Sequence, residues 1–167
     1  MEVAKWKYFM LIKHCPILSK ANNTLLHNAL IIHQKINPCC DQFKNCGHPK
    51  YQSAPNLHEY FPIFKDSLES IFNIDKIENM WCFITFPKNN VDSEWHSHGN
   101  DKNKFSAICY LNNTIGTEFK DGFSIEPDIN TWYVWKSDIE HRPLKKYADK
   151  LRINIVADIY IYNETYT

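Results

Sequence analysis

The chain has 167 residues, enough for one domain with a substantial apolar core. Its 44% hydrophobic and 14% aromatic content excludes a disordered chain. The 19 basic and 19 acidic residues give zero formal net charge, which argues against a protein that wraps nucleic acid. Residues 1–13 lack the apolar core and cleavage site of a secretory signal, and no apolar run is long enough to span a membrane. We therefore expect a cytoplasmic protein whose six cysteines are reduced thiols.

The first part of the chain, up to about residue 76, predicts one strand and two helices. Residues 6–12 form a short apolar run typical of a strand. Asn22 and Asn23 are candidate N-caps of a helix that runs to about Ile36. A second helix is expected after Pro55, because apolar residues recur there at helical spacing: Leu57, Tyr60, Phe61, Phe64, Leu68, Ile71 and Phe72.

The second part predicts only strands. Short apolar or aromatic runs lie between turn residues at 79–86, 104–112, 117–119, 123–126, 131–135 and 151–161. Strands at roughly 8–12-residue spacing are typical of a sandwich or barrel. In the last run, Leu151, Ile153 and Ile155 share one face, and Arg152 and Asn154 share the other. We expect one α+β domain over residues 1–167, with a helical support in residues 1–76 and a β core in residues 77–167.

The segment WHSHGND at residues 95–101 carries the strongest chemical pattern. If it is extended, His96 and His98 project from the same face, about 6–7 Å apart, which is within reach of one metal ion. His141 follows 45 residues after His96, and Arg152 follows 11 residues after His141. Three facial ligands with open positions are typical of a non-haem iron oxygenase, and an arginine binds a carboxylate in a bidentate pair.

Five stretches carry a resemblance to a known family: WHSHG, FSAICYLN, GTEF, FSIEPDINTWYVWKSDIEHRP and LRINI. In this order, over residues 79–161, they resemble the prolyl-hydroxylase-like Fe(II)/2-oxoglutarate-dependent dioxygenases, including short phage and bacterial members. The resemblance implies a double-stranded β-helix, a jelly-roll or cupin-like core flanked by N-terminal helices. It also implies hydroxylation of an unidentified peptide or small molecule, with Fe(II), 2-oxoglutarate and O₂, ascorbate as reductant, and release of succinate and CO₂.

Carried over residue by residue, His96 and His141 resemble the first and last iron ligands. Arg152 resembles the arginine that binds the distal carboxylate of 2-oxoglutarate. The family's middle ligand is acidic, whereas here it is His98; Asp101 is an alternative if the loop curls back.

The family's co-substrate tyrosine is a second point of difference. Phe86 stands at that position and cannot donate a hydrogen bond. Tyr110 and Asn154 are the candidates to replace it in binding 2-oxoglutarate.

Two further hypotheses of function stay open. The first is a three-histidine cupin-like dioxygenase without 2-oxoglutarate, which His98 favours and Arg152 opposes. The second is a catalytically inactive β-helix that serves as a binding protein, which Phe86 and His98 together favour.

Other residues are weaker candidates. Arg142 follows His141 directly, and substrate contact and a solvated strand end both fit it. Trp95, Trp132 and Trp135 are candidates for pocket walls, although we expect at least one of them to be ordinary core. The loop CCDQFKNCGH presents four possible zinc ligands, but its spacing is not that of repeated CxxC pairs, so both a zinc site and plain thiols stay open: Cys39, Cys40, Cys46 and His48.

Overall fold

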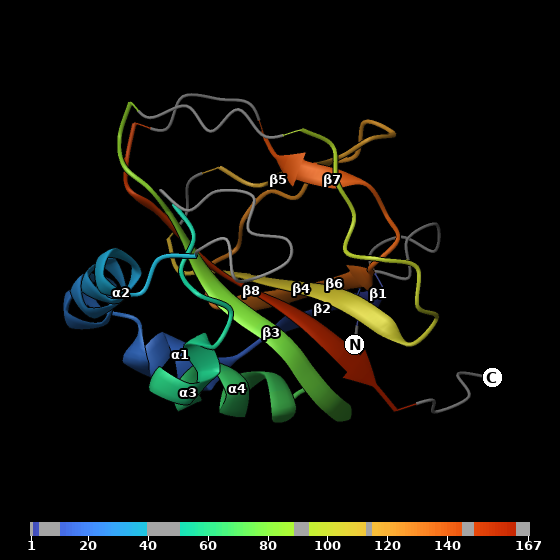
Figure 1. Cartoon of the computed structure of the whole chain (residues 1–167), viewed down its shortest axis with the longest axis horizontal. Helices are drawn as coiled ribbons and strands as arrows, with labels where there is room; N and C mark the ends of the chain where they lie inside the picture. Colours follow the sequence, from blue (N-terminus) through green and yellow to red (C-terminus); the bar gives the residue numbers. More distant parts are fainter. Residues whose placement is uncertain are drawn as a thin grey trace.

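The computed structural model describes residues 2–3, 11–39, 51–88, 94–112, 115–144 and 149–162. The largest element is an antiparallel sheet of six strands in the order β1-β2-β6-β4-β8-β3 (Figure 1). Its strands are β1 (Glu2–Val3), β2 (Leu11–His14), β6 (Thr131–Lys136), β4 (Lys104–Tyr110), β8 (Arg152–Ile161) and β3 (Ile74–Thr85). A second, two-stranded sheet pairs β5 (Thr117–Phe119) with β7 (His141–Pro143).

The helices cover one face of the large sheet, and the small sheet lies over the other (Figure 1). The helices are α1 (Pro16–Ala21), α2 (Thr24–Ile36), α3 (Leu57–Tyr60) and α4 (Pro62–Glu69). Their buried side chains, such as Leu18, Leu30 and Leu68, pack against alternate residues of the sheet, such as Ile153 and Ile155. The fold is therefore α+β, as expected, and each large strand separates an apolar helix-facing side from a second face.

The second face of the large sheet, which we call the inner face, points toward β5 and β7. Tyr110, Tyr133 and Trp135 from the large sheet pack there with Phe119 of β5 and with Ile125. Gly116 lies so close to the backbone carbonyl of Ile125 that a Cβ atom would collide with it, which explains the glycine. The inner face is therefore covered by aromatic packing at the end where the small sheet lies.

Two of the expected elements differ from the structure. The single helix predicted after Pro55 is divided into α3 and α4 at Phe61. Pro62 explains the break, because it has no N–H group and restricts the residue before it to extended conformations. The strand predicted at residues 123–126 is also wrong, since only an isolated bridge joins Ser124 to Glu118.

The other expected elements are found. Asn23 caps α2 by accepting a hydrogen bond from the Leu26 N–H at 3.1 Å, and the helix ends at Ile36 as predicted. Strands occur at 104–110, 117–119, 131–136 and 152–161. Of the strand predicted at residues 6–12, only Leu11 and Ile12 lie within the described ranges, and both belong to β2.

The N-terminal part is not only a helical support. Strand β2 pairs with β6 in the middle of the large sheet, and β3 begins at Ile74, before the expected boundary at residue 76. The single-domain organisation itself stays a prediction.

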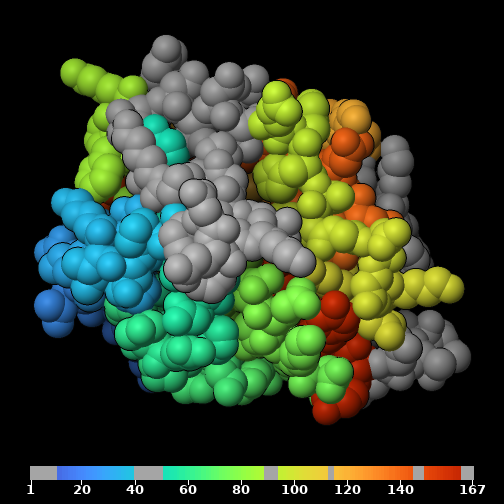
Figure 2. Space-filling view, viewed as in Figure 1, coloured from blue at the N-terminus to red at the C-terminus, as the bar shows by residue number. Residues whose placement is uncertain are grey.

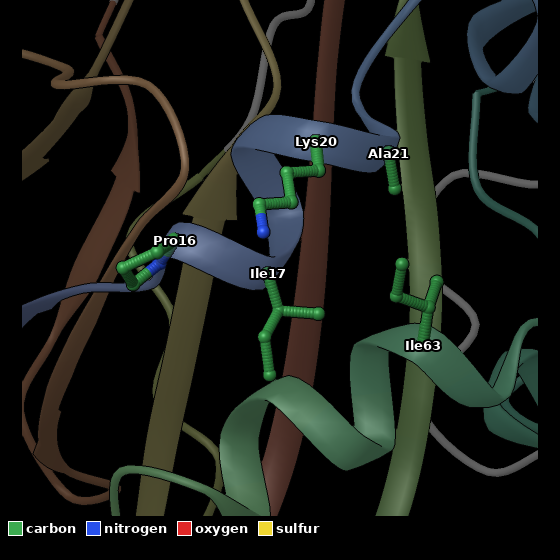
Figure 3. Close-up of a pocket in the computed structure, with 5 residues that line it drawn as sticks. All are labelled: Pro16, Ile17, Lys20, Ala21 and Ile63. Atoms are coloured by element: carbon green, nitrogen blue, oxygen red, sulfur yellow. The ribbon is translucent and has the colours of Figure 1, made fainter.

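A shallow groove lies on the helical side of the molecule, between α1 and α4 (Figure 3). It has a volume of about 330 Å³ and is lined by Pro16, Ile17, Lys20, Ala21 and Ile63. None of the described helices has the length and apolar character needed to cross a bilayer.

Candidate metal centre

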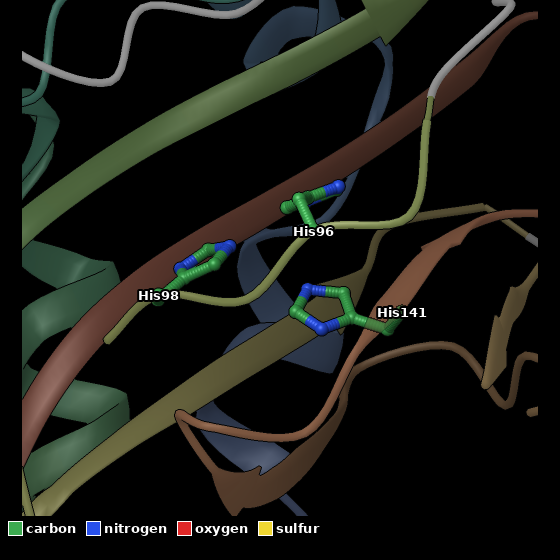
Figure 4. Close-up of side chains that lie close together, drawn as sticks. All are labelled: His96, His98 and His141. Atoms are coloured by element: carbon green, nitrogen blue, oxygen red, sulfur yellow. The ribbon is translucent and has the colours of Figure 1, made fainter. Parts of the chain in front are cut away.

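Three histidines converge beside the inner face of the sheet, as the sequence predicts. His96, His98 and His141 each offer a ligand atom, and these atoms lie within 4.8 Å of one another (Figure 4). The ring centroids are 5.4 Å apart for His96 and His98, 4.7 Å for His96 and His141, and 5.0 Å for His98 and His141. Asp101, the alternative middle ligand, is not in this cluster; its carboxylate accepts a hydrogen bond from the Asn103 N–H at 3.0 Å.

Backbone pairing holds the three rings together. The His96 N–H donates to the His141 carbonyl at 3.1 Å, and the His141 N–H donates back to the His96 carbonyl at 2.9 Å. The His98 N–H donates to the Ser137 carbonyl at 2.7 Å. Because the segment is extended, its side chains alternate, so His96 and His98 point the same way while Ser97 is exposed. The segments around His96 and His141 lie side by side on the surface, yellow-green beside orange (Figure 2).

The hydrogen bonds of the rings fix which nitrogen can bind an ion. Nδ1 of His96 lies 3.0 Å from the Glu94 carbonyl, and Nδ1 of His141 lies 2.8 Å from the Ile139 carbonyl. Nδ1 of His98 lies 2.6 Å from Oδ1 of Asp158. Since a carbonyl or carboxylate oxygen only accepts, each Nδ1 carries the proton and donates, and each Nε2 carries the lone pair. This arrangement is typical of metal-bound histidines, so the three residues fit a metal ion that accepts imidazole ligands.

Burial keeps His141 in the form that a metal requires. Its exposed fraction is 6%, and its ring packs edge-on to Trp135 at 5.0 Å between centroids. Burial, and then the neighbouring rings of His98 and His96, lower the pKa of His141 well below its ordinary value. The imidazole is therefore neutral at pH 7. His96, by contrast, is exposed, so the cluster opens to solvent on that side.

Asp158 completes the centre and was not predicted as a site residue. Its carboxylate is buried on the inner face of β8, where Oδ1 binds His98 and Oδ2 accepts from Nδ2 of Asn79 at 3.1 Å. Nζ of Lys104 lies 3.9 Å from Oδ2 but only 2.6 Å from a carboxylate oxygen of Glu78. The alternation of β8 places Asp158 on the polar face of the strand. Nothing in the sequence distinguishes it there as the partner of His98.

Arg152 lies on the inner face of the same strand, as predicted. It is 3% exposed, its Nε donates to the Ile115 carbonyl at 2.7 Å, and within the described ranges no carboxylate pairs with it. The rings of Phe83 and Tyr110 each lie 5.9 Å from its guanidinium carbon. Burial lowers the pKa of Arg152, and Tyr110 acts in the opposite direction. Guanidinium remains protonated even so, which leaves a buried cation that a carboxylate ligand would neutralise.

Two polar side chains lie beside this arginine in the strand register. Thr85 lies opposite Arg152 in the register of β3 and β8, and Asn154 is the next inner-face residue of β8. Thr85 Oγ1 and Asn154 Oδ1 are both buried, and neither makes a hydrogen bond within the part of the chain that the structure describes. Tyr110 lies opposite Asn154, and its hydroxyl is 2.6 Å from Thr117 Oγ1. Burial raises the pKa of Tyr110 to about 12, so its hydroxyl keeps its proton. The structure thus brings Tyr110 and Asn154 to Arg152.

The tryptophans and Arg142, the weaker candidates, lie in different parts of the fold. Trp135 borders the centre, whereas Trp132 belongs to the helix-facing core and donates to Ser67 Oγ at 3.0 Å, as expected for at least one tryptophan. Arg142 is bound to Glu118 at 2.6 Å and lies 4.0 Å from the centre of the Trp95 ring. Arg142 therefore caps Trp95 at the rim.

Phe86, the residue at the family's tyrosine position, lies at the surface. It is 38% exposed and lies 6.0 Å from Nζ of Lys35 in α2. The inner-face residues of β3 that lie opposite Asn154 and Arg152 are Phe83 and Thr85.

The described cysteines include both free thiols and a disulfide-bonded residue. Cys15, Cys82 and Cys109 are buried free thiols, whereas Cys39 is disulfide-bonded, so the prediction that all six are reduced is wrong for Cys39. Cys40, Cys46 and His48 lie outside the described residues, and the zinc hypothesis stays untested.

Several solved structures are similar in fold to this chain. The viral collagen prolyl hydroxylase of Paramecium Bursaria Chlorella virus-1, solved with 2-oxoglutarate, is 14% identical with a TM-score of 0.59, and the match covers 95% of this chain and 97% of that one. The fold of this chain is therefore similar to that of the prolyl hydroxylases. A Trichoplax adhaerens prolyl hydroxylase, solved with a hypoxia inducible factor peptide, is 11% identical with a TM-score of 0.59, covering 91% and 83% of the two chains. HygX from Streptomyces hygroscopicus, solved with nickel and 2-oxoglutarate, is 9% identical with a TM-score of 0.56, covering 92% and 82%.

No protein-family model and no curated protein sequence matches the chain. The solved structures confirm the resemblance recognised in the sequence as a likeness of fold. The chemistry of the site has to be argued from this chain's own residues.

Proposed function

We propose that the protein is an Fe(II)- and 2-oxoglutarate-dependent oxygenase with a double-stranded β-helix core, which hydroxylates its substrate and releases succinate and CO₂. The observation that carries the proposal is the joint placement, beside one sheet face, of three convergent imidazoles and a buried arginine that has no acidic partner among the described residues. A metal centre alone fits many proteins, but a buried cation on the same sheet face calls for an anionic ligand. A dicarboxylate such as 2-oxoglutarate would meet both.

In this proposal His96, His98 and His141 hold the iron through Nε2. Bound Fe(II) would supply the activation of O₂ and the oxidative decarboxylation of 2-oxoglutarate. Arg152 binds the distal carboxylate of the co-substrate in a bidentate pair. Thr85 and Asn154 can provide further polar contacts because their side-chain oxygens are buried and have no hydrogen-bond partner among the described residues.

The walls of the site exclude water from the co-substrate. Phe83, Tyr110 and Trp135 are each at most 7% exposed. His96 faces solvent, so we place substrate access on that side. We expect the substrate to be a peptide or a small molecule and ascorbate to be the reductant. A cytoplasmic location stays a prediction.

The test is 2-oxoglutarate turnover. Protein loaded anaerobically with Fe(II) and then given 2-oxoglutarate, ascorbate and O₂ should form succinate even without a substrate, at an uncoupled rate. His141→Ala should abolish succinate formation. His27→Ala, in α2, should not change it, because that histidine belongs to the helical layer. Metal binding without succinate would overturn the co-substrate assignment, and failure to bind metal would overturn the centre itself.

A three-histidine dioxygenase without 2-oxoglutarate is the second candidate. It is favoured by His98, which makes all three candidate ligands neutral, as in cupin-like centres. Buried Arg152 opposes it, because a reaction without an anionic co-substrate leaves that charge uncompensated. Oxygen consumption that does not depend on 2-oxoglutarate would favour this candidate, and an iron-loaded protein that consumes no oxygen would indicate a binding protein.

A further inference from the structure

We propose that Asp158 is a positioning residue that orients His98 as the middle ligand and returns to the centre the negative charge that an acidic ligand would supply. The inference rests on the proposed metal centre. It explains how a histidine can stand where the resembling family has a carboxylate.

The geometry around Asp158 leaves its carboxylate little freedom. Oδ1 lies 2.6 Å from Nδ1 of His98, and Oδ2 accepts from Nδ2 of Asn79 at 3.1 Å. The residue is 4% exposed. Both oxygens are therefore engaged on the inner face of the sheet, and rotation of the carboxylate would break two hydrogen bonds.

His98 is held from a second side as well. Its ring stacks on Trp81, with centroids 5.8 Å apart and planes inclined by 27°. With Nδ1 bound to Asp158 and one ring face on Trp81, the ring points Nε2 toward His96 and His141. A carboxylate that holds a metal-bound histidine in this way fixes the tautomer and makes the ligand more basic.

The charge balance leads to the same role. Three neutral imidazoles bring no negative charge to a divalent ion, and among the described residues Asp158 is the carboxylate bonded to one of them. Lys104 offsets only part of that charge, because its ammonium lies 3.9 Å from Asp158 and closer, at 2.6 Å, to Glu78. In a buried site, a charge one hydrogen bond away from the ligand acts strongly on the ion.

The test measures metal affinity rather than turnover. The dissociation constant of Co(II), followed by its visible absorption, is compared between the wild-type protein, Asp158→Asn and the control Asp101→Asn. Asp158→Asn should weaken binding about 10- to 100-fold and change the Co(II) spectrum. Asp101→Asn removes a carboxylate that lies outside the histidine cluster and accepts a hydrogen bond from the Asn103 N–H in its own loop, so the affinity should stay within about twofold of wild type.

A charge-swap pair keeps the test decisive if Asp158→Asn also lowers the melting temperature. His98→Asp would place two carboxylates against each other, so it should bind Co(II) poorly. The double variant His98→Asp/Asp158→Asn moves the single negative charge into the ligand position, and it should recover affinity to within about tenfold of wild type. A purely structural role for Asp158 predicts no such recovery.

Two results would overturn the inference. One is wild-type affinity in Asp158→Asn, and the other is a double variant that binds no better than His98→Asp. If the wild-type protein itself binds no Co(II), the proposed metal centre fails instead, so the two failures are distinguishable.

Discussion

Replacing Arg152 with methionine should remove most of the binding energy for 2-oxoglutarate. The side chain is 3% exposed and, within the described ranges, has no acidic partner, so a bound carboxylate would meet a desolvated guanidinium. Hydrogen bonds to charged groups contribute about 1.5–3 kcal/mol each. We take a loss of about 2–3 kcal/mol, because methionine fills the volume without the charge, and this raises the dissociation constant roughly 30- to 150-fold.

This change can be read from thermal unfolding. With redox-inert Mn(II) present and 2-oxoglutarate at 100 times the wild-type dissociation constant, the ligand stabilises the wild-type protein by about 2.7 kcal/mol. The same concentration stabilises Arg152→Met by only about 0.3–0.9 kcal/mol. For a chain of this size, 1 kcal/mol corresponds to about 2–4 °C. The ligand should therefore raise the melting temperature by about 5–11 °C in the wild-type protein and by under about 4 °C in the variant.

The second arginine provides the matched control. Arg142 is bound to Glu118 and lies against Trp95, so Arg142→Met should keep the full shift. The ligand 2-oxopentanoate, which lacks the distal carboxylate, should shift the wild-type protein and Arg152→Met equally. A wild-type shift with 2-oxoglutarate in Arg152→Met would refute the assignment. Loss of the shift in Arg142→Met alone would indicate that Arg142, not Arg152, binds the distal carboxylate.

Three further predictions concern the fold around the site. Leu68→Ala should lower the free energy of unfolding by about 2–5 kcal/mol in urea, because Leu68 is fully buried, whereas Leu25→Ala, at 80% exposed, should change it by less than about 0.5 kcal/mol. Tyr110→Phe should cost about 1–3 kcal/mol in the same assay, since it leaves the buried Thr117 hydroxyl without its partner. Burial raises the pKa of Cys82 from 9.0 to about 11, so its stabilising contribution is present below pH 9 and is lost as the pH rises to 11. Between pH 7 and 10 the free energy of unfolding should fall by about 1.4 kcal/mol more in the wild-type protein than in Cys82→Ala, and equal slopes would contradict this.

The spacing of apolar residues predicted most of the fold, because within each helix or strand it indicates which face is buried. In β8, Ile153, Ile155, Ala157 and Ile159 pack with the helices, and the alternate residues, such as Val156, lie on the inner face, as the alternation indicated. Two elements were predicted wrongly, the single helix after Pro55 and the strand at residues 123–126, because apolar spacing alone does not show where an element is interrupted. Pro62 interrupts an otherwise continuous apolar stripe, and residues 123–126 make a single bridge although their composition is typical of a strand.

The site was only half predictable for a related reason. His96, His98 and His141 could be named because the extended spacing of the first two and the order of the third suggest one centre. The partner of His98, by contrast, is 60 residues away, and it depends on the register between strands. Thr85 was missed in the same way, since only the pairing of β3 with β8 places it opposite Arg152.

The alternation of β8 explains how one strand serves both stability and chemistry. Its inner-face positions carry Arg152 and Asn154 toward one end and Asp158 toward the other, so a single strand presents the proposed co-substrate anchor and the residue that holds His98. The alternating positions, Ile153, Ile155 and Ala157, lie in the helix-facing core. A one-residue shift in register would turn both charges into that core and the isoleucines toward the metal centre. The cost of burying unpaired charge against the helices therefore selects the same register that the site needs, and the chemistry of the inner face helps to specify the fold that supports it.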